Sequence, residues 1–200
     1  MNKIISFFKA NIDEIIKPVV VLLAICIVIP LALAVTNAVT SERIAELEAK
    51  NETATMKQLI KAENFPKATY KGEEEFDYYI AKQGGERVGY IFITSAKGYG
   101  GAVSVMTAVN NDGTVKSVAI LDASNETPGL GQNVTKEAFY SQFDGKKNGV
   151  KVVKNGAISE NNEINAVTGA TISSTAVTKA VNEAQQRFEK ISKTEVAVNE

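Results

Sequence analysis

The four residues "TGAT" at positions 168–171 stand directly before an amphipathic stretch and could bind a phosphate group. If a helix begins near residues 172–173, Thr171 lies at its N-terminus, where unpaired backbone N–H groups and the helix dipole favour negative charge. Gly169 allows the backbone to approach a bulky group, and Ala170 keeps the surroundings small. These residues predict a phosphate seat, while a plain helix N-cap is the commonplace alternative.

The hexapeptide "ETPGLG" at positions 126–131 follows a predicted strand and could bind a flat ring system. Its proline and two glycines favour a rigid turn with exposed backbone N–H and C=O groups. Such groups can bind the polar edge of a ring, and Leu130 can press on its face. The alternatives are an ordinary Pro-Gly turn and an enzyme that uses Glu126 and Asp122 as an acid/base pair.

A third glycine-rich segment, "KGYGG" at positions 97–101, precedes another predicted strand. Lys97 and Tyr99 could contact a ligand from this segment. A plain connection between two strands explains its residues equally well.

The composition excludes several classes of protein. With 200 residues, the chain is long enough for one domain with a core plus an appendage. Its net charge of −1 argues against nucleic acid as a partner, because nucleic acid requires a basic face. Histidine is absent and Cys26 is the single cysteine, which removes most metal sites, histidine-based nucleophile pairs and intrachain disulfides. A redox function would therefore require an organic cofactor.

The N-terminal part of the chain contains an uncharged and mostly apolar stretch from Pro18 to Ser41. At about 1.5 Å rise per residue, about 20 such residues cross a hydrocarbon core of about 30 Å. We therefore predict a transmembrane helix at 18–40, with a cleaved signal peptide and a buried core helix as alternatives. Lysines before this stretch favour a cytoplasmic N-terminal segment, 1–17, and an extracytoplasmic remainder.

The remainder of the chain divides into a stalk, a domain and a tail. Residues 41–66 mix apolar residues with charges and favour a helical stalk that ends at Phe65-Pro66. Residues 67–195 are expected to form the domain, and residues 196–200 a short tail.

The patterns in the domain predict the α+β class. Strand-like alternation begins at Glu73 and surrounds two turn signals, "QGG" at 83–85 and "NDG" at 111–113. A short helix is expected at 134–143 and one more strand at 148–156. Apolar residues at helical spacing from Val177 to Ile191 predict a final helix that packs on the sheet. We expect a mainly antiparallel sheet with helices on one side.

Taken together, these features resemble the covalent-FMN-binding domain of bacterial respiratory complexes. The features are a single N-terminal span, Gly-Tyr-Gly-Gly before a strand, the hexapeptide after the next strand and Thr-Gly-Ala-Thr before the last helix. With its motifs in this order and at this spacing, the chain is similar to the G subunits of Rnf complexes, which are ferredoxin:NAD oxidoreductases. It is more distantly similar to the C subunit of the sodium-pumping NADH:quinone reductase. The resemblance covers essentially the whole chain.

The resemblance implies that Thr171 carries FMN through a phosphoester bond, which a separate flavin transferase makes from FAD. The motif around it would be completed by Thr168, Gly169 and Ala170. The flavin ring would be lined by the hexapeptide residues Glu126, Thr127, Pro128, Gly129, Leu130 and Gly131, and Tyr99 is a further candidate contact. One departure from the family motif is Asn165, where the family usually has aspartate.

The functional hypothesis is a single-pass protein of the bacterial inner membrane that relays electrons within an ion-translocating ferredoxin:NAD⁺ oxidoreductase. Its partners would be the other integral membrane and redox subunits, and the flavin transferase during maturation. No catalytic acid or base and no metal are expected. The alternatives are a subunit of a related quinone reductase, a stand-alone extracellular FMN domain, and an anchored scaffold or sensor without redox function.

Overall fold

The computed structural model describes residues 12–72, 74–154, 156 and 161–198 of the 200-residue chain. The chain divides into two compact units, with the boundary between Asn51 and Glu52. Most of the predicted cytoplasmic segment 1–17 and part of the predicted tail 196–200 lie outside the described residues.

The long helix α2 (Ile12–Leu59) runs across the boundary between the two units. Its residues up to Asn51 are the described part of the first unit, and its last residues, 52–59, belong to the second. Within α2, the segment Ile16–Ser41 contains an 18-residue window with a mean hydropathy of 3.1 and is exposed throughout. In the part of the chain that the structure describes, this is the one helix that is long and apolar enough to cross a membrane. The helix ends at Leu59, before the predicted stop at Phe65-Pro66, so residues 60–66 continue as irregular backbone.

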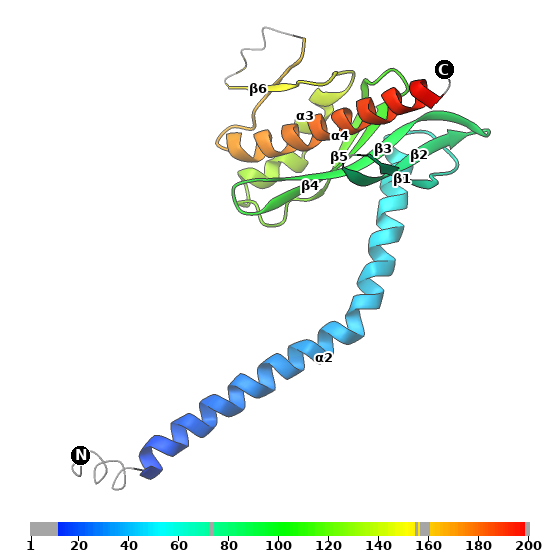
Figure 1. Cartoon of the computed structure of the whole chain (residues 1–200). Helices are drawn as coiled ribbons and strands as arrows, with labels where there is room; N and C mark the ends of the chain where they lie inside the picture. Colours follow the sequence, from blue (N-terminus) through cyan, green and yellow to red (C-terminus); the bar gives the residue numbers. More distant parts are fainter. Residues whose placement is uncertain (1–11, 73, 155, 157–160, 199–200) are drawn as a thin grey trace. The chain divides into compact units, whose positions relative to one another are not determined.

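The second unit is built on one five-stranded antiparallel sheet with the strand order β1-β2-β3-β4-β5. Its strands are β1 (Lys67–Lys71), β2 (Glu75–Gln83), β3 (Glu86–Lys97), β4 (Ala102–Asn110) and β5 (Val115–Asp122). The C-terminal helix α4 (Thr171–Val198) crosses one face of this sheet (Figure 1). The predicted α+β class is confirmed.

Two glycine-containing turns form the predicted hairpins. Gly84 and Gly85 connect β2 to β3 with φ values of 57° and 87°, a region that glycine adopts without steric cost. Residues 111–114 connect β4 to β5, and Gly113 in this turn has a φ of 82°. Strand β1 was not predicted, because the alternation was expected to begin only at Glu73.

The sheet is covered by helical residues on both faces, which corrects the expectation of helices on one side. Tyr90 and Phe92 of β3 point to the face that packs against Phe188 of α4. Ile91, between them, packs on the opposite face against Met56 at the end of α2. This alternation is the ordinary consequence of the period of two in a strand. The apolar stripe predicted for α4 is buried, as expected: Val177, Val181, Ala184, Phe188 and Ile191.

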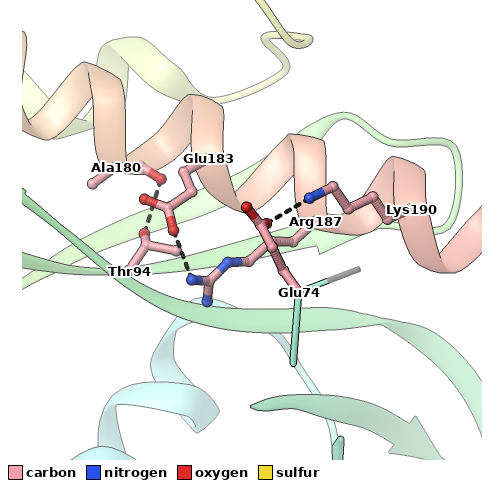
Figure 2. Close-up of polar contacts among 6 residues, drawn as sticks. All are labelled: Glu74, Thr94, Ala180, Glu183, Arg187 and Lys190. Atoms are coloured by element: carbon pink, nitrogen blue, oxygen red, sulfur yellow. Dashed lines mark hydrogen bonds and ion pairs between the residues drawn. The ribbon is translucent and has the colours of Figure 1, made fainter. Parts of the chain in front are cut away.

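Polar contacts hold α4 in place on the sheet (Figure 2). The hydroxyl of Thr94, which is buried in β3, donates a hydrogen bond of 2.8 Å to the carbonyl oxygen of Ala180. Further along the helix, Lys190 forms an ion pair of 2.6 Å with Glu74. These contacts add to the apolar packing that positions α4 on the sheet.

The chain between β5 and α4 forms short elements that were predicted only in part. The single helix expected at 134–143 is divided into η1 (Gly131–Thr135), α3 (Glu137–Tyr140) and η2 (Ser141–Phe143). The strand expected at 148–156 is β6 (Lys151–Val153). It pairs in parallel with β7 (Glu163–Asn165), which was not predicted.

Candidate functional site

The three glycine-rich segments of the sequence meet around one pocket of about 570 Å³. Its walls come from the turn after β3, the hexapeptide and the start of α4. The lining residues are Tyr99, Thr127, Leu130, Gly131, Gly169, Ala170, Thr171, Ile172 and Ser173. Seven of these were candidate cofactor contacts, and the structure adds Ile172 and Ser173 to them.

Large apolar side chains are exposed at the rim of this pocket. Tyr99 is 70 % exposed, Ile172 is 55 % exposed and Leu130 is 47 % exposed. Among the described residues of the second unit, no other large apolar side chain is exposed to this degree. Because a grouped patch of this kind marks an interaction site more often than a scattered surface residue does, the rim favours an apolar ligand.

The start of α4 leaves its first backbone N–H groups open. The Ser174 N–H donates to the carbonyl oxygen of Ala170 at 2.9 Å, which makes Ala170 the N-cap residue. Alanine has no side-chain oxygen that could cap the helix. Within the described residues, the N–H groups of Thr171, Ile172 and Ser173 meet no acceptor. An anion in the pocket would find these donors and the positive end of the helix dipole.

Ser174 holds the Thr-Gly-Ala-Thr loop in shape. Its buried hydroxyl accepts a hydrogen bond from the Val167 N–H at 3.0 Å and donates one to the Ala170 carbonyl at 2.9 Å. Gly169 has a φ of 76°, and a Cβ at this position would lie 3.1 Å from Leu130. The loop and the hexapeptide therefore touch at Gly169, where a larger residue would be strained.

Glu126 lies below the pocket and ties its three walls together. The side chain is 1 % exposed. Its Oε1 accepts a hydrogen bond of 2.9 Å from the Gly100 N–H, and its Oε2 accepts one from the Ser173 hydroxyl. A Cβ on Gly131 would lie 2.6 Å from Oε2, and one on Gly98 would overlap Oε1. These glycines therefore make room for the carboxylate.

The surroundings of Glu126 keep it ionised. Burial raises the pKa of its carboxyl group, because a charge is less stable away from water. Hydrogen bonds from Ser173 and from the backbone N–H groups of residues 99–101 act in the opposite direction and outweigh burial. The pKa is therefore lower than that of an ordinary glutamate, and the group is a structural anion at neutral pH.

The remaining candidate contacts lie away from the walls of this pocket. Pro128 and Gly129 are exposed on the turn of the hexapeptide. Thr168 is exposed and lines a second recess of about 400 Å³, together with Asn165. The backbone of Asn165 is paired with the side-chain amide of Gln142, through a 2.8 Å bond from the Asn165 N–H and a 3.3 Å bond to its carbonyl oxygen.

The surroundings of Glu126 and Asp122 do not favour the alternative of an acid/base pair. Asp122 is exposed at the end of β5, and its Oδ1 accepts a hydrogen bond of 2.8 Å from the Ser124 N–H. Both oxygens of Glu126 are already used by other donors. Ser173, in contrast, is a site residue that no motif in the sequence singles out from the neighbouring hydroxyl residues Thr168, Thr171 and Ser174.

Comparison with known proteins first defines the class of domain. Residues 98–186, which include all three walls of the pocket, match the family model described as the FMN-binding domain. The fold is similar to that of NqrC from Shewanella oneidensis, with a TM-score of 0.50 and 22 % identity over 57 % of this chain and 61 % of that one. It is also similar to the C subunit of the Na⁺-translocating NADH-quinone reductase from Parabacteroides distasonis, with a TM-score of 0.51 and 22 % identity over 61 % and 73 %. At this identity the likeness concerns the fold.

Curated relatives then define the family. The chain is 38 % identical to the G subunit of the proton-translocating ferredoxin:NAD⁺ oxidoreductase complex of Clostridium ljungdahlii, over 81 % of this chain and 85 % of that one. It is 36 % identical to the G subunit of the Na⁺-translocating ferredoxin:NAD⁺ oxidoreductase complex of Acetobacterium woodii, over 92 % and 98 %. The chain therefore belongs to the family of G subunits of these ion-translocating oxidoreductase complexes. The resemblance carried by its sequence motifs is confirmed.

Proposed function

We propose that this chain is a membrane-anchored flavoprotein that carries FMN in the 570 Å³ pocket, joined by a phosphoester bond to Thr171. The observation that carries the proposal is the position of Thr171. It lines the pocket, and it is also the first residue of α4, where the backbone N–H groups are open. The match of residues 98–186 to the FMN-binding domain supports the choice of cofactor.

The residues at the pocket suit the parts of this cofactor. The volume lies within the range of about 300–1,000 Å³ that is usual for small-molecule sites. A flat ring would find apolar surface at Tyr99, Leu130 and Ile172. Without a bound ring these side chains face water, which is unfavourable for a grouped apolar patch. The open end of α4 suits a phosphate.

The chemistry of attachment requires only a hydroxyl from this chain. Within the described residues, no hydrogen bond engages the Thr171 side chain, so its oxygen is available. Thr171 Oγ would form the new bond to phosphorus and lose its proton, while the anhydride bond of FAD breaks and AMP leaves. We propose that a flavin transferase catalyses this exchange, and that one anionic phosphate oxygen remains beside the helix N-terminus.

The bound flavin would accept and pass on electrons, and the protein would bind, orient and partly shield it. We propose that this relay operates within an Rnf-type complex that couples ferredoxin and NAD⁺ to ion transport, as the names of the relatives state for their complexes. The partners would be the other integral membrane and redox subunits. Copurification of these subunits with the chain from native membranes tests that assignment, because a stand-alone domain would purify without them.

We further propose that Ile16–Ser41 is the membrane anchor, with the domain on the extracytoplasmic side. The orientation rests on the lysines that precede the span, since positive charges are retained in the cytoplasm. In this orientation, protease added to cells that have lost their cell wall or outer membrane, but keep an intact inner membrane, would cleave the domain. Protection of the domain under these conditions would contradict it.

Flavin attachment is tested by intact-mass analysis of the chain from cells that also make the flavin transferase. The wild-type chain should be heavier than its sequence by the mass of FMN minus water. Thr171→Ala should lack the increment, and Thr168→Ala, a matched change in the same motif, should retain it. An increment that survives in Thr171→Ala, or is missing from the wild type, would refute the attachment.

A further inference from the structure

A second and smaller recess adjoins the candidate flavin pocket at Thr171. It has a volume of about 160 Å³ and shares Thr171 and Ile172 with the larger pocket. Its other lining residues are Lys97, Thr175, Ala176 and Lys179. Thr171 therefore stands at the border between an apolar pocket and a recess with two cations. The recess is below the usual size of a site for a whole cofactor and suits a compact group.

The recess is formed by one face of a helix and the end of a strand. Thr171, Thr175 and Lys179 follow one another at a spacing of four residues, which brings them to the same face of α4. Lys97 is the last residue of β3, which packs against α4. The Thr175 hydroxyl donates a 2.7 Å hydrogen bond to the Thr171 carbonyl and so fixes the first turn.

The two lysines lack a protein anion. Within the described residues, neither Lys97 nor Lys179 forms an ion pair, and no carboxylate lines the recess. Glu183 lies one helical turn beyond Lys179, but its carboxylate pairs with Arg187 at 2.6 Å (Figure 2). The recess thus brings two ammonium groups to the same side of α4 as the Thr171 side chain, and they favour a bound anion there.

We propose that Lys97 and Lys179 hold the phosphate group of the flavin in this recess, while the ring occupies the larger pocket. The inference rests on the proposed function and assigns the two ends of the ligand to two cavities. A phosphate esterified to Thr171 keeps a negative oxygen, which must lie near the Thr171 side chain. The lysines stabilise this charge, and they also attract the phosphate before the ester forms.

The test compares FMN with riboflavin, which has the same ring but no phosphate. Both are titrated into the unmodified full-length chain, made without flavin transferase and kept in detergent, while flavin fluorescence is followed. FMN should bind about tenfold more tightly than riboflavin, as expected for a charge-assisted contact. The double variant Lys97→Gln/Lys179→Gln should bind the two flavins about equally, with unchanged affinity for riboflavin. The control is Lys82→Gln/Lys116→Gln, which removes two exposed lysines from β2 and β5 and should keep the preference.

The outcome is distinguishable from that of the attachment experiment. If the wild type does not prefer FMN, or if the control pair loses the preference equally, the phosphate seat is refuted even when Thr171 carries FMN. Failure of both flavins to bind refutes it as well. A lysine-dependent preference for FMN in a chain that never becomes modified at Thr171 would support the seat and refute the covalent bond.

Discussion

Ser173, in the first turn of α4, donates a hydrogen bond to Oε2 of Glu126, which lies below the pocket and is almost fully buried. The other carboxylate oxygen accepts from the Gly100 N–H, so one side chain joins the turn after β3, the hexapeptide and the helix start. These are the three segments that line the pocket. The shape of the candidate flavin site therefore depends on a residue that supports it from beneath.

Glu126→Gln should destabilise the domain. Glutamine has nearly the same shape, but its amide group would place an N–H where a carboxylate oxygen now accepts a hydrogen bond. Leaving a buried donor without an acceptor lowers the free energy of unfolding by about 1–3 kcal/mol. Thermal unfolding should show a loss of about 2–4 °C for each kcal/mol. Glu86→Gln, a change at an exposed residue of β3, should leave the transition in place. Equal stability of the two variants would contradict the role of Glu126.

The stability that Glu126 contributes should depend on pH. Its pKa is lowered in the folded state, because hydrogen bonds from Ser173 and residues 99–101 outweigh burial. The unfolded chain therefore binds the proton more readily, and the contribution is present above the ordinary pKa of glutamate, about 4.3. It is lost as the pH falls through the folded-state pKa. Denaturant titrations at pH 7 and pH 4 should show a smaller difference between wild type and Glu126→Gln at pH 4. A difference that grows at pH 4 would reverse the sign.

Gly131→Ala should disturb the same contact by crowding. The added Cβ would lie 2.6 Å from Glu126 Oε2 and 2.7 Å from Ser173 Oγ, so one partner must move. Such overpacking costs about 1–3 kcal/mol. Flavin content should fall together with stability, because Gly131 also lines the pocket. Gly145→Ala serves as the comparison, since Gly145 has a positive φ of 75° but open space around it. That variant should keep its flavin.

Ser174→Ala should loosen the loop that carries Thr171. The Val167 N–H would lose its acceptor and the Ala170 carbonyl one of its donors, which costs about 1–3 kcal/mol. We expect slower flavin attachment, measured as the rate at which the mass increment appears with a fixed amount of flavin transferase. The matched control is Thr178→Ala, which removes a buried hydroxyl that donates only to the Ser174 carbonyl. Equal attachment rates for the two variants would show that the Ser174 contacts do not matter for the site.

The sequence predicted the parts of the fold that are specified locally. The two hairpin turns follow from glycines whose positive φ values only a few residue types tolerate, and α4 follows from a long apolar stripe. Strand β1 escaped prediction because it is a short edge strand in which no residue is fully buried. Strand β7 escaped because it has three residues and pairs in parallel with β6 across an intervening segment. Such pairing leaves no periodic signal.

The sequence predicted which segments form the site. It did not predict which of their residues line the pocket and which support it from beneath. Glu126 was expected beside a flavin ring, and the structure places it beneath the pocket with both oxygens hydrogen-bonded. A contact between Glu126 and the ring stays a prediction. A glutamate in a glycine-rich turn is usually exposed to solvent. Nothing in residues 126–131 indicates that Gly98 and Gly100, which belong to another loop, lie beside this carboxylate. Ser173 was given no role of its own for the same reason, since its partner lies 47 residues away.

The central claim is that Thr171 is the residue that bears the flavin. Peptide fragmentation by mass spectrometry should be applied to the full-length chain, purified from cells that make the flavin transferase. We predict an increment equal to FMN minus water on Thr171 itself, with Thr168, Ser173 and Ser174 of the same peptide unmodified. An unmodified Thr171 in that sample, or an increment on any of its three neighbours, would contradict this assignment.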